Sequence, residues 1–275
     1  MSTAFAKRQR LIELLQSYER VLVAFSGGVD SAFLSAMANE ALGDSALAVT
    51  GVSASLSATE KADAEAMATQ LGIRHEWIET HEMDNPAYVT NGLDRCFHCK
   101  NELYGLLGAL AGRADIAVVI DGTNADDHRD VRPGRQAAVQ HDVRSPLAEL
   151  GFTKAEIRDL SREMDLPIWD KPAMACLASR IPHGTSVTVE ALDQIAGAEA
   201  MLRALGLRHV RVRHHGTLAR IETDADGMTI ALDPGGRDQI VSRLRNLGFK
   251  QVTLDLAGYR PAGTQGSGES SAPNR

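Results

Sequence analysis

The chain has 275 residues, of which 44% are hydrophobic, and a formal net charge of −7 at pH 7. A chain of this length and apolar content can bury a core in one large or two modest domains. The acidic balance argues against a nucleic-acid-binding protein, because such proteins usually carry a basic surface. No apolar stretch reaches the roughly 18 residues that a membrane span needs, and the N-terminus lacks the apolar run of a signal peptide. We therefore expect a cytoplasmic protein without nucleic-acid or membrane partners.

Strand-like and helical patterns alternate through the first part of the chain. The expected strands are residues 21–25, 47–52, 74–78 and 116–120. The expected helices are residues 8–18, 32–41, 58–71, 100–111 and 153–164, the last opened by a capping box, Thr153-x-x-Glu156. This alternation predicts a parallel sheet with helices on both faces. In such sheets ligands bind at the carboxyl ends of the strands, where segments 26–31, 52–55 and 121–127 are expected.

The pattern changes around residues 167–183, a proline-containing stretch with the character of a loop. A smaller α+β unit is expected after it, with helices at 188–205 and 236–247 and strands at 208–213, 217–223 and 250–256. Glycine, serine and proline dominate the C-terminus without apolar residues, which is typical of disorder. The expected organisation is an α/β domain over 1–170, a cysteine-bearing link over 171–187, an α+β domain over 188–260 and a disordered tail over 261–275.

The hexapeptide Ser-Gly-Gly-Val-Asp-Ser stands at 26–31, between an apolar strand and a helix. Glycines allow a tight turn and a close approach of the ligand, and the helix start directs N–H groups and positive potential at an anion. Asp30 would repel a phosphate unless a cation bridges the two, so it indicates Mg²⁺. The expected phosphate-binding residues are Ser26, Gly27, Gly28, Asp30 and Ser31. A glycine-rich turn without a ligand is the alternative.

This hexapeptide resembles the PP-loop of the N-type ATP pyrophosphatases, and no Walker A motif is present. The resemblance implies an adenine nucleotide α-hydrolase-like fold and cleavage of ATP between its α and β phosphates. Such enzymes transfer AMP to a carbonyl or carboxyl oxygen and release pyrophosphate, and nitrogen or sulfur then attacks the activated carbon. The PP-loop alone does not choose between amidotransferases, NAD synthetases and sulfur-inserting enzymes.

All three cysteines lie in two short motifs, Cys96-Phe97-His98-Cys99 and the segment 171–180, which contains Cys176. An odd number of cysteines argues against a disulfide framework. Three thiolates suit a 4Fe–4S cluster that leaves one iron open. A zinc site with His98 as the fourth ligand and a redox dithiol are the alternatives.

Polar residues follow the expected strands at 47–52 and 116–120. Asp121 and Asp127 are candidates to share Mg²⁺ with Asp30. The alternative is an Asx-type turn that closes the strand, which is expected to account for one of the carboxylates at 121–127. We further expect the nucleotide to contact Val52, Ser53, Gly122, Thr123, Asn124 and Arg132.

Four further segments, 121–127, 132–134, 171–180 and 211–215, together resemble the LarE family. Its members are PP-loop sulfur transferases that serve the nickel-pincer nucleotide cofactor of lactate racemase. The likeness extends from about residue 8 to 260. It implies that ATP adenylates the two carboxylates of pyridinium-3,5-biscarboxylic acid mononucleotide and that each then becomes a thiocarboxylate. It also implies a homo-oligomer, a trimer or a hexamer.

The resemblance implies two modes of sulfur delivery, and Cys176 takes part in both. In the sacrificial mode the Cys176 thiolate displaces AMP, and elimination leaves the sulfur on the substrate and dehydroalanine on the enzyme. In the cluster mode three cysteines hold a 4Fe–4S cluster, and a sulfide on its open iron attacks the adenylate. The additional cysteines, Cys96 and Cys99, favour the cluster mode, with sulfide or another external sulfur donor.

Basic residues complete the expected site. Arg211 and Arg213 are two residues apart on an expected strand, so they face the same way, and two guanidiniums suit the phosphate of the substrate. A solvated strand face is the alternative. Ser179 and Arg180 are expected to contact the substrate, and Lys100 is expected either to steady charge at the adenylate or to be a surface lysine.

Three other functions remain as alternatives. A tRNA-thiolating PP-loop enzyme would need a basic RNA track, which the sequence does not show. An amide-forming synthetase gives no reason for three clustered thiols. A non-catalytic ATP-binding module would bind ATP without releasing pyrophosphate.

Overall fold

The computed structural model describes residues 3–129, 133–170 and 175–259, which form two compact units. The first unit comprises the described residues up to 170 together with 183–188, and the second comprises 175–182 and 189–259. The segment 171–187, expected as a link, is thus divided between the units. The expected disordered tail, 261–275, lies outside the described residues.

Hydrogen bonds to the segment around Asn91 attach residues 183–188 to the rest of the first unit. The Gly184 N–H donates to the Asn91 carbonyl (3.0 Å) and the Val187 N–H to the Val89 carbonyl (2.9 Å). The Asn91 side-chain amide donates to the Thr185 carbonyl (2.9 Å). The chain thus enters the second unit, returns to the first unit at residues 183–188 and then enters the second unit again. For this reason the boundary between the units does not coincide with the change in sequence composition.

The first unit contains a parallel sheet of four strands in the order β3-β2-β1-β4, which confirms the expected α/β class. Its strands are β1 (Val21–Ala24), β2 (Ala46–Val52), β3 (Arg74–Glu79) and β4 (Val118–Asp121). The central strands read as continuous apolar runs because both faces of the sheet are covered. In register, Leu22 of β1 lies beside Leu47 of β2 and Val119 of β4.

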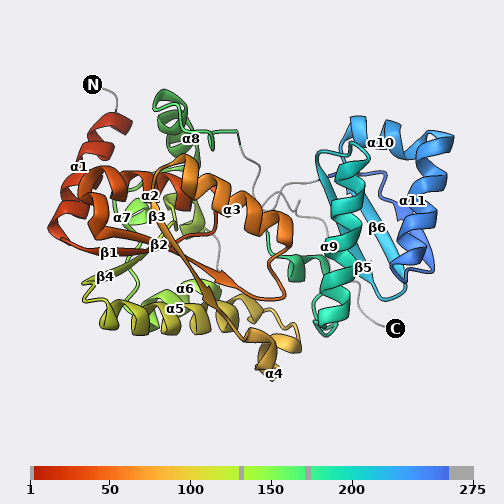
Figure 1. The fold of residues 1–275 in the computed structure, drawn as a ribbon, viewed down its shortest axis with the longest axis horizontal. Helices are drawn as coiled ribbons and strands as arrows, with labels where there is room; N and C mark the ends of the chain where they lie inside the picture. Colours follow the sequence, from red (N-terminus) through yellow and green to blue (C-terminus); the bar gives the residue numbers. More distant parts are fainter. Residues whose placement is uncertain (1–2, 130–132, 171–174, 260–275) are drawn as a thin grey trace. The chain divides into compact units, whose positions relative to one another are not determined.

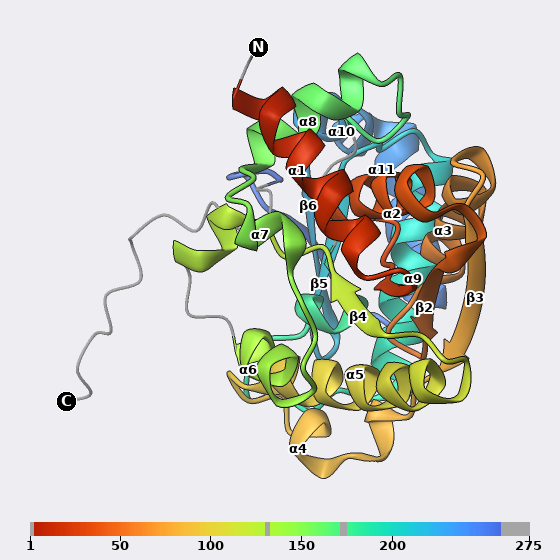
Figure 2. The same ribbon diagram turned by 90° about the vertical axis from the view of Figure 1, so that its left-hand side faces the viewer.

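Helices cover both faces of this sheet. Figure 2 shows α1 and α2 on one side of the strands and α5 and α6 on the other. Each face has its own core: Val21, Val23 and Ile120 pack with α1, α2 and α8, whereas Leu22 and Val119 pack with α5 and α6. The α-helices of this unit are α1 (Thr3–Ser17), α2 (Val29–Leu42), α3 (Ala58–Gln70), α4 (Pro86–Val89), α5 (Arg95–Arg113), α6 (Pro133–Gln140), α7 (Pro146–Glu149) and α8 (Lys154–Glu163).

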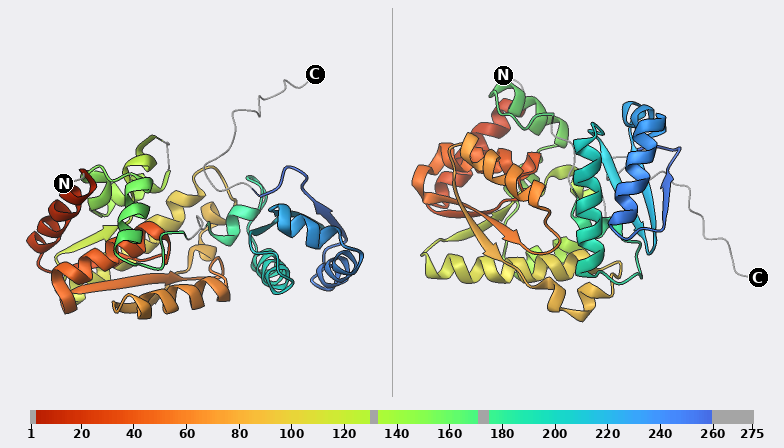
Figure 3. Two further views of the ribbon diagram at one scale, coloured as in Figure 1. Left: turned by 90° about the horizontal axis from the view of Figure 1, so that it is seen from above. Right: turned by 45° about the vertical axis from the view of Figure 1, so that its right-hand side comes forward.

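The second unit, coloured teal to blue in Figure 3, is a small α+β fold, and its sheet has the strand order β5-β6-β7. Strands β5 and β6 are antiparallel, and β7 runs parallel to β6. Val212 and Ile221 belong to the core that this sheet forms with α9 and α11. The elements are α9 (Val189–Ala204), β5 (Val210–His215), β6 (Leu218–Thr223), α10 (Ala225–Leu232), α11 (Pro234–Asn246) and β7 (Gln251–Leu254).

The expected capping box at the start of α8 is confirmed. The Thr153 hydroxyl accepts from the Glu156 N–H (3.3 Å), and the Glu156 carboxylate accepts from the Thr153 N–H (2.9 Å). Such a box fixes the first turn of a helix because it satisfies N–H groups that the helix itself cannot pair. It therefore determines where Lys154, the first residue of α8, stands.

Among the helices that the structure describes, none is both long and apolar enough to cross a membrane.

Candidate functional site

The carboxyl ends of β2, β1 and β4 are neighbours at one edge of the first sheet. The three segments expected at strand ends, 26–31, 52–55 and 121–127, therefore lie at the same edge. Gly122 shows how closely they approach: a Cβ on it would lie 2.7 Å from the Ser31 amide nitrogen and 2.9 Å from its Cα. Only glycine fits there without a shift of backbone, because real Cβ contacts of this length are essentially absent.

The expected PP-loop forms a turn held by its own serines. Gly27 adopts φ of 68°, a left-handed conformation that glycine accepts without strain. The hydroxyls of Ser26 and Ser31 lie 3.0 Å apart, and the Ser31 hydroxyl accepts from the Ser26 N–H (3.2 Å). Gly28 is the N-cap of α2, and a glycine has no side chain with which to cap the helix start. The turn therefore presents a helix N-terminus suited to a phosphate.

Asp30, in the first turn of α2, forms an ion pair with the Lys154 ammonium through its Oδ2. Its other oxygen, Oδ1, is buried and has no hydrogen-bond partner among the residues that the structure describes. A buried carboxylate oxygen without a partner is costly. The arrangement is chemically suited to a cation, because Mg²⁺ prefers carboxylate oxygens.

Asp121 is already saturated with hydrogen bonds and only 4% exposed. Its Oδ1 accepts from the Ser145 hydroxyl (2.7 Å) and the Thr123 N–H (3.1 Å), and its Oδ2 accepts from the Tyr104 and Thr123 hydroxyls (2.7 and 2.9 Å). The Lys100 ammonium lies 3.8 Å away. Burial, followed by the charge of Asp121, raises the pKa of Tyr104 well above its ordinary value, so the phenol stays a donor. Asp121 thus joins β4 to α5.

The residues after Asp121 form the Asx-type turn that was the alternative to a metal site. The Asn124 side-chain oxygen, Oδ1, accepts from the N–H groups of Asp126 (2.9 Å) and Asp127 (3.4 Å), and Asp127 Oδ2 accepts from the Asn124 N–H (3.1 Å). Within 3–129, 133–170 and 175–259, no three His, Cys, Asp or Glu residues are grouped as a metal site. Asp30 is therefore the better candidate for Mg²⁺. Arg132 lies outside the described residues.

Ser53 follows Val52, the last residue of β2, and takes part in a buried polar cluster. The hydroxyls of Ser53 and Ser55 lie 2.9 Å apart, and both donate to Glu82 Oε1 (2.5 and 3.0 Å). Glu82 follows β3 and is buried. The Glu82 carboxylate therefore holds the loop after β2 in place. No local sequence pattern predicts this role for Glu82.

The Cys-x-x-Cys motif lies in the first turns of α5, which begins at Arg95 and not at the expected residue 100. Cys96 is exposed and Cys99 is half-buried. Residues three apart lie on the same side of a helix, so both thiols face one side of α5. Lys100 Nζ lies 5.6 Å from the centre of the Tyr104 ring, which places the expected adenylate-binding lysine beside Asp121.

Cys176 belongs to the second unit, where its exposed side chain precedes a short 3-10 turn, Leu177–Arg180. Arg180 is 5% exposed and donates to the carbonyls of Ala175 and Cys176 (3.0 Å for the latter). Its guanidinium also makes two bonds to buried Glu199 (2.9 and 3.1 Å). Arg180, expected to contact the substrate, thus anchors the backbone on either side of the Cys176 side chain.

Arg211 and Arg213 share one face of β5, but their surroundings differ. Arg213 Nε donates to Glu222 (2.9 Å) and its Nη1 to the Ser179 carbonyl (2.9 Å). Arg211 is buried and its guanidinium stacks 4.7 Å from the centre of the Tyr259 ring. Burial lowers the pKa of Arg211, and the nearby guanidiniums of Arg180 and Arg213 lower it further. A concentration of positive charge in a buried place favours an anion.

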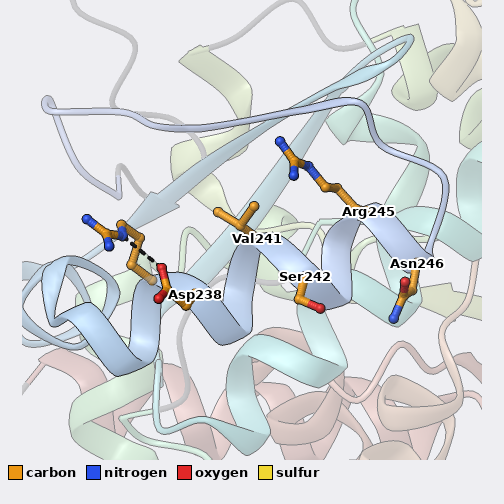
Figure 4. A pocket seen from close by; sticks show the side chains of 6 residues that line it. Asp238, Val241, Ser242, Arg245 and Asn246 are labelled. Carbon is orange, nitrogen blue, oxygen red and sulfur yellow. Dashed lines mark hydrogen bonds and ion pairs between the residues drawn. The ribbon is translucent and has the colours of Figure 1, made fainter.

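Two pockets lie away from these residues. One follows the exposed side of α11 (Figure 4) and the other lies at the amino ends of the first sheet, around Arg20, Leu47 and Arg74. The first is lined by Arg237, Asp238, Val241, Ser242, Arg245 and Asn246. Neither is lined by an expected site residue.

Comparison with known proteins gives matches to both parts of the chain. A family model described as NAD synthase matches residues 9–93, which include the PP-loop. An uncharacterized protein of Synechocystis, slr1717, is 45% identical over 93% of this chain and 95% of its own. The pyridinium-3,5-bisthiocarboxylic acid mononucleotide synthase of Lactiplantibacillus plantarum is 35% identical over 94% of each chain. A protein of Methanocaldococcus jannaschii, MJ0830, is 27% identical over 88% of this chain.

These matches agree with the geometry of the first unit, where a glycine turn and a helix start stand at the carboxyl edge of a parallel sheet. The similarity to the synthase covers nearly the whole of both chains, including the segment around Cys176. The chain therefore belongs to the LarE family and is an ATP-dependent sulfurtransferase with a PP-loop domain.

Proposed function

We propose that this enzyme converts the two carboxylates of pyridinium-3,5-biscarboxylic acid mononucleotide into thiocarboxylates. The product is the bisthiocarboxylic acid mononucleotide, from which a nickel-pincer cofactor is made. The observation that carries the proposal is the 35% identity, over 94% of each chain, to the synthase of this compound.

The first step is adenylation. A carboxylate oxygen of the substrate attacks the α-phosphorus of ATP, the bond to the bridging α–β oxygen breaks, and pyrophosphate leaves with the electron pair. The start of α2, where the N-cap is a glycine, and the hydroxyls of Ser26 and Ser31 suit the leaving pyrophosphate. Asp30, whose Oδ1 lies buried without a partner in the described structure, would hold Mg²⁺ that neutralises phosphate charge. The Lys100 ammonium would stabilise the negative charge that develops as the acyl adenylate forms.

In the second step sulfur displaces AMP from the acyl carbon. If Cys176 is the donor, its thiolate forms a thioester. Loss of the Cys176 Cα proton then breaks the Cβ–S bond, and the electron pair stays on sulfur as a thiocarboxylate. If external sulfide is the donor, it attacks the same carbon and Cys176 is unchanged. We favour the external donor because the chain also carries Cys96 and Cys99.

The same three cysteines would hold a 4Fe–4S cluster, which supplies an open iron for a sulfide ligand. Two facts about the described residues support this ligand set. Cys96 and Cys99 lie one turn apart on α5, and the thiols of Cys96 and Cys176 are exposed. The Arg180 bonds to the carbonyls around Cys176 would hold that residue in one conformation. Arg211 and Arg213 would bind the substrate phosphate.

The test is an anaerobic assay with ATP, the pyridinium biscarboxylic mononucleotide and sulfide. We expect AMP and pyrophosphate in equal amounts, and a product whose mass shows oxygen replaced by sulfur. Formation of an amide with ammonia in place of sulfide, or sulfur transfer to tRNA only, would contradict the proposal. ATP binding without pyrophosphate release in the presence of the substrate would indicate a non-catalytic module.

A further inference from the structure

We propose that Tyr259 is the positioning residue for Arg211: its ring stacks on the guanidinium and leaves the in-plane N–H groups of that guanidinium to bind the phosphate of the substrate. The inference rests on the proposed binding of a phosphate by Arg211 and Arg213. It concerns only residues of the second unit, and neither ATP nor the sulfur donor enters it.

The chain turns after β7 and returns to the end of β6, where Tyr259 is bound. The Asp255 N–H donates to the Ile221 carbonyl (2.8 Å), and the Tyr259 N–H donates to the Thr223 carbonyl (2.9 Å). Gly258 adopts φ of 75°, a left-handed conformation that glycine accepts without strain. A Cβ on Gly258 would also lie 3.2 Å from the Thr223 carbonyl oxygen. The backbone of Tyr259 is therefore held beside the last residue of β6.

This attachment places the Tyr259 ring against the start of β5. Thr223 pairs with Val210 in the sheet, and Arg211 is the next residue along β5. The central carbon of the Arg211 guanidinium lies 4.7 Å from the centre of the Tyr259 ring, and Arg211 is only 4% exposed. The His209 ring lies 6.0 Å from the same tyrosine ring. The ring thus lies against two side chains from residues 209–211.

A guanidinium offers two different surfaces for binding. Its faces stack on aromatic rings, and its edge carries N–H donors that lie in one plane. Because the face of an aromatic ring is electron-rich, stacking by Tyr259 offsets part of the cost of burying the Arg211 charge. Stacking also restrains the side chain, so less conformational entropy is lost when a phosphate binds. Tyr259 thus prepares the donors of Arg211 for parallel bonds to a phosphate.

The neighbouring Arg213 shows what a different restraint does. Its Nε donates to the Glu222 carboxylate and its Nη1 to the Ser179 carbonyl. These acceptors hold Arg213 in place, but they also use N–H groups that a phosphate would need. An aromatic ring restrains a guanidinium without using its in-plane donors. Tyr259 therefore suits an arginine whose donors are to be given to a ligand.

The experiment compares Tyr259→Leu and Tyr259→Phe with wild type, without ATP and without added metal. Pyridinium-3-carboxylic acid mononucleotide is titrated by calorimetry, and inorganic phosphate is titrated by phosphorus NMR line broadening. We expect Tyr259→Leu to bind both probes about three- to thirtyfold more weakly, the range of a cation–π contact between partly and fully desolvated groups. Tyr259→Phe keeps the ring and should bind both within about twofold of wild type. Tyr259→Met replaces the leucine variant if that variant does not fold.

A double-mutant cycle separates positioning from direct contact with the ligand. In an Arg211→Lys background the ring has no guanidinium to orient, because an ammonium lacks a planar set of donors. Tyr259→Leu should then lower the affinity for either probe by less than about twofold. A loss as large as in the wild-type background would show that Tyr259 acts without Arg211, and the proposal would be wrong.

Val252→Ala is the control for stability. Val252 is a partly buried residue of β7 that packs on the core of the second unit, so this variant should lose stability and keep both affinities. Tyr259→Leu that binds phosphate as tightly as wild type, or more tightly as a mere cover over Arg211 would require, overturns the proposal. A loss of affinity for the mononucleotide alone also overturns it, because Tyr259 would then contact the pyridinium or ribose itself.

The titrations and the assay of sulfur transfer can fail independently, because inorganic phosphate reports on Arg211 whatever the substrate is. If sulfur transfer to the pyridinium compound is not found, the phosphate titrations still decide the role of Tyr259. If sulfur transfer is found and Tyr259→Leu binds both probes like wild type, the proposed function stands and the role of Tyr259 does not.

Discussion

Gly122 is the residue at which a single methyl group would disturb the PP-loop most directly. A Cβ there would meet the backbone of Ser31 at 2.7 Å, and backbone cannot move as a side-chain end can. We predict that Gly122→Ala lowers the free energy of unfolding by about 1–3 kcal/mol, the usual cost of overpacking, and weakens ATP binding. Chemical denaturation and calorimetry with an ATP analogue measure the two effects.

Gly112→Ala is the control for that variant. Gly112 is an exposed residue of α5, and a Cβ on it would meet nothing within 4 Å. Alanine should therefore stabilise the helix by about 0.5–1 kcal/mol and leave ATP binding unchanged. Equal effects of the two alanines would refute the close approach of Gly122 to Ser31.

The partly buried His75 makes the free energy of unfolding depend on pH. Its Nε2 lies 2.8 Å from the Thr50 hydroxyl, which donates to the Phe25 carbonyl (2.7 Å) just before the PP-loop. Burial lowers the pKa of His75 below its ordinary 6.5. The unfolded chain then binds more protons than the folded one below that pH, so stability falls as the pH decreases through about 6.5. Denaturation of wild type and His75→Gln across this range should show a shallower decline in the variant; identical slopes would exclude His75 as a source.

Sequence patterns identified the PP-loop residues because the chemistry there is local: six consecutive residues form the turn. They did not identify Lys154, which meets Asp30 across 124 positions, or Glu82, which meets Ser53 across 29. They also could not show that Asp121 is saturated, since two of its donors, Tyr104 and Ser145, come from other elements. Side-chain partners that depend on the tertiary fold are not visible in local spacing.

At the scale of elements, Glu199 joins α9, β5 and the segment around Cys176. It is 1% exposed and accepts from Arg180, Arg203 and the Val212 N–H. We predict that Glu199→Gln lowers the free energy of unfolding by about 3–5 kcal/mol, because the buried Arg180 guanidinium loses its counter-charge. Arg203→Met removes a more exposed partner of the same carboxylate and should cost at most about 1 kcal/mol. Denaturation curves of similar midpoint for the two variants would contradict this ranking.

The order of strands and helices in the first unit follows from hydrophobic periodicity, and the expected strands 47–52 and 74–78 match β2 and β3 closely. Helix α5 begins at Arg95, earlier than the expected residue 100, so the Cys-x-x-Cys motif forms part of the helix. Helix α10 was not expected at all. It begins directly after β6, where the Asp224 side chain accepts from the Gly227 N–H (2.8 Å) and caps a short helix that contains glycine.

At the scale of the whole molecule, the three cysteines favour the proposed cluster mode of sulfur delivery over the sacrificial mode. We predict that protein purified without oxygen is brown and contains about four irons and four acid-labile sulfides per chain. Cys96→Ala should lose the iron and the sulfide-dependent turnover. Iron-free protein that resists reconstitution would instead favour Cys176 as the sacrificed donor, and mass spectrometry would then find dehydroalanine at that position.

The most direct test of the account is Cys176→Ala, assayed beside wild type with ATP, the pyridinium biscarboxylic mononucleotide and sulfide. Cys176 is exposed, so removal of its thiol should not destabilise the second unit, which thermal denaturation checks. We predict that the variant still releases pyrophosphate and forms the acyl adenylate but produces no thiocarboxylate. Sulfur transfer at the wild-type rate by Cys176→Ala would contradict both modes of delivery and with them the proposed mechanism.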